Sequence, residues 1–130
     1  GYVRSMLENN ITPQDVWNIP DRSQEGEAIP LELPKEMPTA FVCNCDETAF
    51  QLVKELTAKG YHIPEDISVA GFDDSISDIY DPPLTTVRML DQGEVFYKAL
   101  FEEKGEACVN KWCYFPYQIV RRSSTRRITN

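Results

Sequence analysis

The sequence predicts an α/β fold with a mostly parallel sheet flanked by helices. Two apolar runs of strand length, Ala40–Cys45 and Ile67–Phe72, stand on either side of a segment with helical periodicity. Four apolar residues in that segment share one face at helical spacing: Ala49, Leu52, Val53 and Leu56. A strand, a helix and a strand over about 30 residues indicate a βαβ unit, which has parallel strands and a right-handed crossover.

The elements before this unit are predicted to be a helix, a short strand and a long loop. Gly1–Asn9 carries apolar residues near helical spacing, and Val16–Ile19 is expected to form a short strand. Several prolines interrupt Asp21–Pro38 and block a regular helix or a central strand there. We therefore expect mostly loop in this stretch, with one extended piece at Ile29–Leu33.

The central helix and the elements after it also have recognisable ends. Asp46 is a good N-cap type for the central helix, and Gly60 lies where a C-cap glycine belongs. Three further elements are predicted from periodicity and composition: a strand at Thr85–Met89, a helix at Gln92–Lys104, and a strand at Lys111–Arg121 broken at Pro116.

Composition and charge exclude several classes of protein. The chain has 130 residues, of which 42% are hydrophobic and 26% charged, so we expect residues 1–130 to form one globular domain. No apolar run approaches the ~20 residues that a membrane-spanning helix needs. The net charge of −8 has the wrong sign for direct nucleic-acid binding, whose affinity comes largely from neutralising phosphates. The one basic cluster is expected to be a solvated tail: Arg121, Arg122, Arg126 and Arg127.

Four cysteines raise the possibilities of a disulfide or a zinc site: Cys43, Cys45, Cys108 and Cys113. Zinc sites favour gaps of two to four residues within each pair, usually on loops. The first pair has a single intervening residue and lies in a predicted strand. We therefore expect small buried thiols in a reducing, cytoplasmic compartment and no metal.

Acidic residues follow both strands of the predicted βαβ unit. Asp46 follows the first strand, and Asp73 and Asp74 follow the second. Ligands of open parallel sheets bind outside the carboxyl ends of the strands. Carboxylates accept hydrogen bonds, which suits ligands rich in hydroxyls or amines, such as sugars. The alternative is that Asp46 caps its helix and that the Asp73–Asp74 pair stabilises a turn.

Little in the sequence points to catalysis or to a cofactor. The single histidine, His62, lies in a helix-to-strand connection, and Gly71 stands alone between strand residues. Neither a nucleophile elbow nor a glycine-rich phosphate loop is present. We expect no enzyme activity, no catalytic residue and no cofactor.

Four strings resemble one family in their order and spacing: PTAFVCNCDETAF, GYHIPEDISVAGFDD, YDPPLTTVRM and YQIVRRSST. They resemble the C-terminal part of LacI/GalR-type transcription regulators, whose effector domain shares the fold of type I periplasmic sugar-binding proteins. The resemblance runs from about Pro38 to Thr125, and Gly1–Leu7 also looks like a helix of this family.

The resemblance implies a fragment that holds most of the second, C-terminal effector-binding subdomain. The first subdomain and a DNA-binding headpiece would precede Gly1, so operator DNA would be bound only through that missing N-terminal part. The expected function is sensing of a small-molecule effector, with a sugar or related polyol as the expected class, together with homodimerisation. The alternative is a solute-binding protein of a sugar uptake transporter. No membrane partner is expected.

The resemblance also assigns roles to individual residues. Asp46 matches the aspartate that hydrogen-bonds the effector in the family, although Cys45 replaces the usual asparagine before it. Asp73 is the expected second ligand contact. The helix Thr48–Lys59 would lie at the dimer interface, with three residues on its outward face: Phe50, Gln51 and Lys54.

Overall fold

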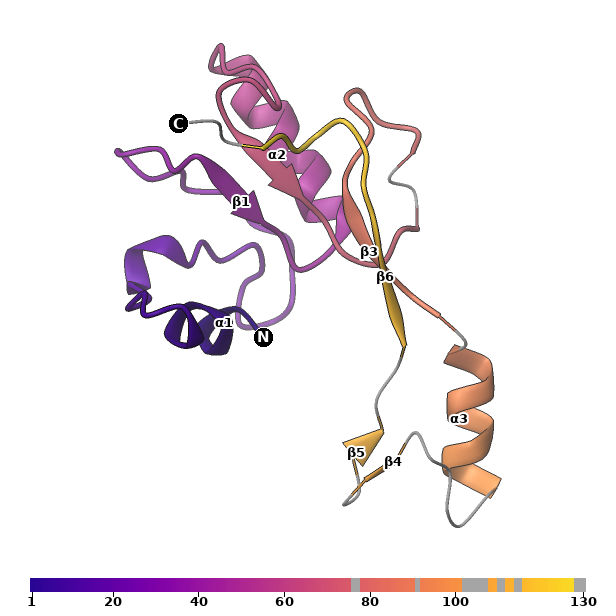
Figure 1. Cartoon of the computed structure of the whole chain (residues 1–130). Helices are drawn as coiled ribbons and strands as arrows, with labels where there is room; N and C mark the ends of the chain where they lie inside the picture. Colours follow the sequence, from indigo (N-terminus) through magenta and orange to yellow (C-terminus); the bar gives the residue numbers. More distant parts are fainter. Residues whose placement is uncertain (76–77, 91, 102–107, 110–111, 114–115, 128–130) are drawn as a thin grey trace. The chain divides into compact units, whose positions relative to one another are not determined.

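The computed structural model describes residues 1–75, 78–90, 92–101, 108–109, 112–113 and 116–127. It has an α/β architecture, as predicted (Figure 1). Two compact units are present, Gly1–Pro38 and Thr39–Asn130. The second unit contains the predicted βαβ motif.

The βαβ motif consists of β1 (Ala40–Val42), α2 (Asp46–Ala58) and β2 (Ser68–Ala70). The two strands are parallel, with Phe41 opposite Val69. The prediction of a parallel pair joined by a helix is therefore confirmed. Each strand is shorter than its apolar run, because the runs continue into the loops that carry the acidic residues.

Helix α2 begins one residue earlier than predicted. Cys45 is the N-cap, with extended backbone angles of φ −152° and ψ 167°. Asp46 is the first helical residue, so the prediction that it caps the helix is wrong. Its carboxylate is engaged elsewhere, although a negative charge in the first turn still favours the helix dipole.

The end of α2 is a Schellman motif. Gly60 adopts a left-handed φ of +89°, which a glycine takes without a Cβ penalty. Its amide bonds to the Thr57 carbonyl at 3.0 Å, and the Tyr61 amide bonds to the Leu56 carbonyl at 3.1 Å. The predicted role of Gly60 in ending the helix is confirmed.

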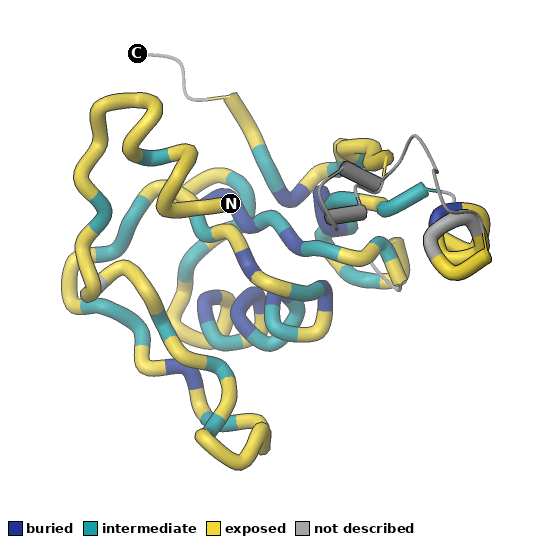
Figure 2. Tube along the Cα trace, turned by 90° about the horizontal axis from the view of Figure 1, so that it is seen from below, coloured by how far each residue is buried: buried dark blue, intermediate teal, exposed yellow. Residues whose placement is uncertain are grey.

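The core of the second unit lies between α2 and the strands beside it (Figure 2). All four residues of the predicted helix face are buried, with Ala49 and Leu56 fully inaccessible. They are joined by apolar side chains from the strands and the loops next to them: Ile67, Val69 and Leu84. Full burial of such a side chain contributes about 1.5–3 kcal/mol, so this cluster is the main source of stability.

An antiparallel pair continues the sheet beyond β2. Strand β3 (Thr86–Met89) pairs with β6 (Tyr117–Val120), and Val87 lies opposite Ile119. A parallel bridge joins Ala70 of β2 to Thr85, the residue before β3. Strand β3 therefore runs parallel to β2, and β6 pairs with β3 in antiparallel fashion. The sequence did not predict this antiparallel pairing.

Helix α3 (Gln92–Phe101), strand β5 (Trp112–Cys113) and strand β6 agree with the predictions where they are described, whereas strand β4 (Cys108–Val109) was not predicted. Helix α3 lies within the predicted helix, whose last three residues fall outside the described part. Strand β6 begins directly after Pro116, as expected from the predicted break. The two short strands, β4 and β5, pair in antiparallel fashion.

The first unit has a helix and little other regular structure. Helix α1 (Tyr2–Glu8) confirms the first prediction. The predicted strand at Val16–Ile19 is wrong, because a 3₁₀ turn, η1 (Asp15–Trp17), occupies this place and bonds its amides locally. The expected extended piece at Ile29–Leu33 forms no ladder in the described structure. None of the described helices has the length and apolar character needed to cross a membrane.

Candidate functional site

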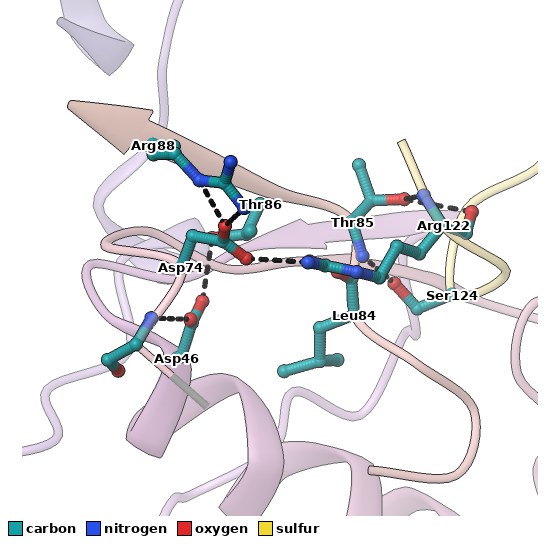
Figure 3. Close-up of polar contacts among 9 residues, drawn as sticks. Asp46, Asp74, Leu84, Thr85, Thr86, Arg88, Arg122 and Ser124 are labelled. Carbon is teal, nitrogen blue, oxygen red and sulfur yellow. Dashed lines mark hydrogen bonds and ion pairs between the residues drawn. The ribbon is translucent and has the colours of Figure 1, made fainter. Parts of the chain in front are cut away.

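The candidate site lies at the carboxyl ends of β1 and β2, the edge where open parallel sheets bind ligands (Figure 3). The three predicted acids come from two elements. Asp46 starts α2 after β1, and Asp73 and Asp74 stand in the loop after β2. The structure brings the two loops into contact, because the Ser75 amide donates to the Asp46 carboxylate at 3.1 Å.

Asp46 is the most buried acid of the site, with an exposed fraction of 1%. Its Oδ2 accepts the bond from Ser75, and its Oδ1 accepts a hydrogen bond of 2.7 Å from the Thr86 hydroxyl. One carboxylate therefore ties together the start of α2, the loop after β2 and strand β3. Charge-assisted bonds of this kind are worth about 1.5–3 kcal/mol each.

Gly71 makes room for the Asp46 carboxylate. A Cβ at position 71 would overlap Asp46 Oδ1 and would lie 3.3 Å from the Asp46 Cα. The glycine that seemed isolated in the sequence is thus explained by close packing against the helix start. No phosphate-binding role is needed to account for it.

Asp74 has its side chain only 3% exposed, and it pairs with two arginines. Arg88 of β3 contacts Oδ2, and Arg122 Nη2 lies 2.8 Å from Oδ1. Arg122 also donates through Nη1 to the Leu84 carbonyl at 2.9 Å. Two cations, one on β3 and one in the segment after β6, thus balance this nearly buried charge.

Sequence reasoning missed both arginines. The basic cluster was expected to be a solvated tail, but Arg122 is only 17% exposed in its side chain and is ion-paired. Arg126 of the same cluster donates to the carbonyls of Pro64 and Glu65. The solvated-tail interpretation is therefore wrong for Arg122, whereas Arg126 is exposed although it makes these bonds. The one feature of the sequence that could have identified Arg122 as part of the site is its position next to the predicted last strand.

Asp73 differs from the other two acids because it is exposed. Its φ of +102° and the φ of +52° at Asp74 place two successive non-glycine residues in the left-handed region. Such positions cost about 1–3 kcal/mol each and persist where neighbouring contacts hold them. One such contact is the Asp73 amide, which bonds to the Val87 carbonyl at 2.9 Å.

A second polar cluster holds the C-terminal segment against the strands. The Ser124 hydroxyl donates to the Val69 carbonyl at 2.6 Å and accepts the Thr85 amide at 2.8 Å. The Thr85 hydroxyl donates to the Arg122 carbonyl at 3.0 Å. These bonds place Arg122 within reach of Asp74.

The chemistry available at this edge is hydrogen-bond acceptance by a carboxylate. Asp46 accepts hydrogen bonds from two neutral donors and Asp74 is paired with two arginines, and both side chains are nearly buried, which leaves Asp73 as the accessible acid. Within the described ranges, no group of three or more histidine, cysteine or acidic residues could hold a metal ion.

The outward side of α2 carries the three predicted dimer-interface residues. The Phe50 ring stacks on Tyr80 with a centroid distance of 3.8 Å and an interplanar angle of 16°. The Lys54 ammonium lies 5.2 Å from the Phe50 ring centroid, and Gln51 donates to Glu55 at 3.2 Å. Burial raises the pKa of the Tyr80 hydroxyl, and nearby carboxylates add to the shift. Phe50 is thus partly covered within its own chain, while Lys54 is exposed.

The other residues singled out in the sequence lie away from this edge or have local roles. His62 binds Asp66 through its backbone amide at 2.8 Å, within a turn. Cys43 is buried, and the half-buried Cys45 has its sulfur 3.3 Å from the Thr48 hydroxyl. The side chains of Cys108 and Cys113 lie outside the described part.

Comparison with known proteins relates the chain to a family. Residues 1–125 match the model of a periplasmic binding protein-like domain. The chain is 31% identical to the HTH-type transcriptional repressor PurR of Glaesserella parasuis, over 98% of the chain and 42% of that relative. The chain therefore spans less than half the length of that relative.

Solved structures of LacI-type regulators are among those similar to the chain. A dimeric Lac repressor with a C-terminal deletion and a K84L substitution has a TM-score of 0.58 and 31% identity, covering 68% of this chain and 34% of that one. A LacI family transcriptional regulator from Enterococcus faecium with bound ribose has a TM-score of 0.52 and 27% identity. That match covers 70% of this chain and 35% of the other.

Proposed function

Since the chain belongs to the periplasmic binding protein-like effector domains of LacI/GalR-type transcription regulators, we propose that it senses a small-molecule effector and mediates homodimerisation. Residues 1–130 would form most of the C-terminal effector-binding subdomain. Operator DNA would be bound by an N-terminal domain of the full-length protein. Such a regulator would act in the cytoplasm, without a membrane partner or a catalytic step.

The observation that carries this proposal is the placement of three acids at the carboxyl ends of two parallel strands. A sugar or related polyol offers hydroxyl donors, which match carboxylate acceptors. The ribose bound to the Enterococcus faecium relative supports this ligand class. The similar proteins with named functions are transcriptional regulators, so a solute-binding protein of a transporter is not favoured.

We assign the accessible contact to Asp73 and a deeper contact to Asp46. Asp73 is exposed at the edge. Asp46 is 1% exposed, and each of its oxygens already accepts one bond. Each carboxylate oxygen can accept a second bond, so a ligand hydroxyl could reach Asp46 once the Ser75 segment moves aside.

Calorimetric titration of the full-length protein with D-ribose, D-arabinose and D-glucose tests this proposal. We expect one of these sugars to bind, and we expect Asp73→Asn to weaken its affinity about 10-fold through loss of a charged hydrogen bond. Asp46→Asn should weaken affinity by about 10–150-fold on the same grounds. Asp66→Asn is the matched control, because Asp66 is exposed and its carboxylate bonds to His62 in the same turn.

Two results would contradict the assignment. Absence of binding by all three sugars would remove the proposed ligand class. Equal affinity of the parent and of both the Asp73→Asn and Asp46→Asn variants would remove the proposed site. If a sugar does bind, an operator-binding assay follows. Release of operator DNA on addition of that sugar would distinguish a regulator from a protein that only binds sugar.

Homodimerisation is proposed through the outward side of α2, at Phe50, Gln51 and Lys54. The dimeric state named for the similar Lac repressor supports it. We expect Lys54→Glu to raise the dimer dissociation constant of the full-length protein in sedimentation equilibrium. Lys59→Glu makes the same charge change at the end of the same helix and should leave the constant unchanged. Equal dissociation constants for both variants would place the interface elsewhere.

A further inference from the structure

The loop after β2 is held to the β3/β6 pair by an ion cluster made of Asp74, Arg88 and Arg122. Arg88 comes from β3, and Arg122 follows β6. Both contact the Asp74 carboxylate, whose side chain is 3% exposed. The cluster therefore joins the loop to β3 and to the segment that follows β6, and Figure 3 shows Arg88 and Arg122 both directed at Asp74.

The loop has two successive residues with left-handed backbone angles, Asp73 and Asp74. Aspartate adopts such angles more readily than most residues other than glycine, but they still have an energetic cost. Two bonds hold the backbone on either side of Asp74: the Asp73 amide to the Val87 carbonyl, and the Ser75 amide to Asp46. Asp74 is the residue between them, and its charge binds the arginines.

We propose that Asp74 is a positioning residue that locks the segment Asp73–Ser75 to the β3/β6 pair, so that loop and pair open as one unit. A ligand bound at Asp73 would then stabilise the β3/β6 pair together with the loop. This last consequence rests on the proposed function, whereas the lock itself does not.

Hydrogen exchange of the full-length protein without ligand tests the lock. In the parent protein we expect the amides of Asp73 and Ser75 to exchange at the same rate as the paired amides of β3 and β6. In Asp74→Asn, the two loop amides should exchange about 10-fold faster, because charged hydrogen bonds are lost. The β3/β6 amides should keep their parental rate. A merely structural role would instead speed exchange in both regions together.

Asp78→Asn is the matched control, since Asp78 is exposed and lies four residues further along the chain. It should leave both regions unchanged. If Asp74→Asn fails to fold, Arg88→Gln replaces it, because Arg88 has a side chain 47% exposed and its loss removes only one partner. Parental loop rates in the folded variant, or the same acceleration in Asp78→Asn, would overturn the proposal.

A second arm adds D-ribose, or whichever of the three sugars binds, at saturating concentration. In the parent, slower exchange should extend from the loop to β3 and β6, whereas in Asp74→Asn it should stay within the loop. Slowing of β3 and β6 in both proteins would overturn the transmission of the ligand effect through Asp74. If none of the three sugars binds, the proposed function is contradicted. The hydrogen-exchange result obtained without ligand would still decide whether Asp74 locks the loop to the β3/β6 pair.

Discussion

The two compact units of the chain differ in how they bury apolar side chains. In Gly1–Pro38, Leu31 is the one buried hydrophobic residue among the described positions. Helix α1 leaves Val3 and Leu7 more than half exposed, at 55% and 58%. In Thr39–Asn130, one face of α2 and the strands beside it form a continuous core. Helical spacing of apolar residues therefore does not build a core by itself: α1 buries none of its residues, whereas the apolar face of α2 packs against neighbouring strands.

The largest expected effect comes from cutting into that core. Leu56 is fully buried in the last turn of α2, so Leu56→Ala should lower the free energy of unfolding by about 2–5 kcal/mol. Urea denaturation followed by circular dichroism measures this loss. Leu31→Ala is the matched change in the first unit and should leave the main transition unchanged. Equal losses of unfolding free energy in Leu56→Ala and Leu31→Ala would contradict the proposed difference between the two units.

Removal of the donor to Asp46 is expected to have the next largest effect. Thr86→Val keeps the side-chain shape but leaves the buried Oδ1 of Asp46 without the 2.7 Å hydroxyl bond. The free energy of unfolding should fall by about 1.5–3 kcal/mol, as for other bonds to charged groups. Thr57→Val, on an exposed position of α2, is the control and should change stability by less than about 0.5 kcal/mol. A similar result for both variants would show that the Asp46 bonds add no stability.

Two glycines allow the same substitution to be compared in the two units. Gly71→Ala forces a Cβ onto Asp46 and should cost about 1–3 kcal/mol of unfolding free energy. Gly26→Ala meets no atom within 4 Å, but Gly26 has a φ of +85°. It should therefore disturb only its own turn, with a cost of about 1 kcal/mol that is confined to the first unit. Hydrogen exchange in the two units, together with urea denaturation, distinguishes these effects.

The smallest expected effect concerns pH. The backbone amide of His62 donates to Asp66, and this bond lowers the pKa of Asp66 below its ordinary value of 3.8. A lowered pKa in the folded state means that the stabilisation is complete above the ordinary value and is lost as the pH falls through the lowered one. Titration of the Asp66 carboxyl by NMR checks the direction. In Asp66→Asn this part of the pH dependence should disappear, and its persistence would assign it to another group.

The site shows where sequence reasoning reached its limit. The positions of Asp46, Asp73 and Asp74 followed from periodicity and from the rule for strand ends. The difference in burial among these three acids could not be predicted in this way, because it depends on hydrogen-bond donors that are distant in the sequence. Thr86 is 40 residues from Asp46, and no local pattern marks its hydroxyl as the partner of a buried carboxylate. Arg122 was misjudged for the same reason, since its charge alone suggests a solvated position.

The sequence by itself determined the βαβ unit, the end of α2 at Gly60 and the strand edge at which the acids stand. These features depend on spacing and on local backbone preferences, which act over a few residues. Only the tertiary structure decided that Asp46 and Asp74 are buried and bonded while Asp73 remains exposed. It also decided that β6 pairs with β3, because hydrogen bonds and ion pairs between distant residues form only once the chain has folded.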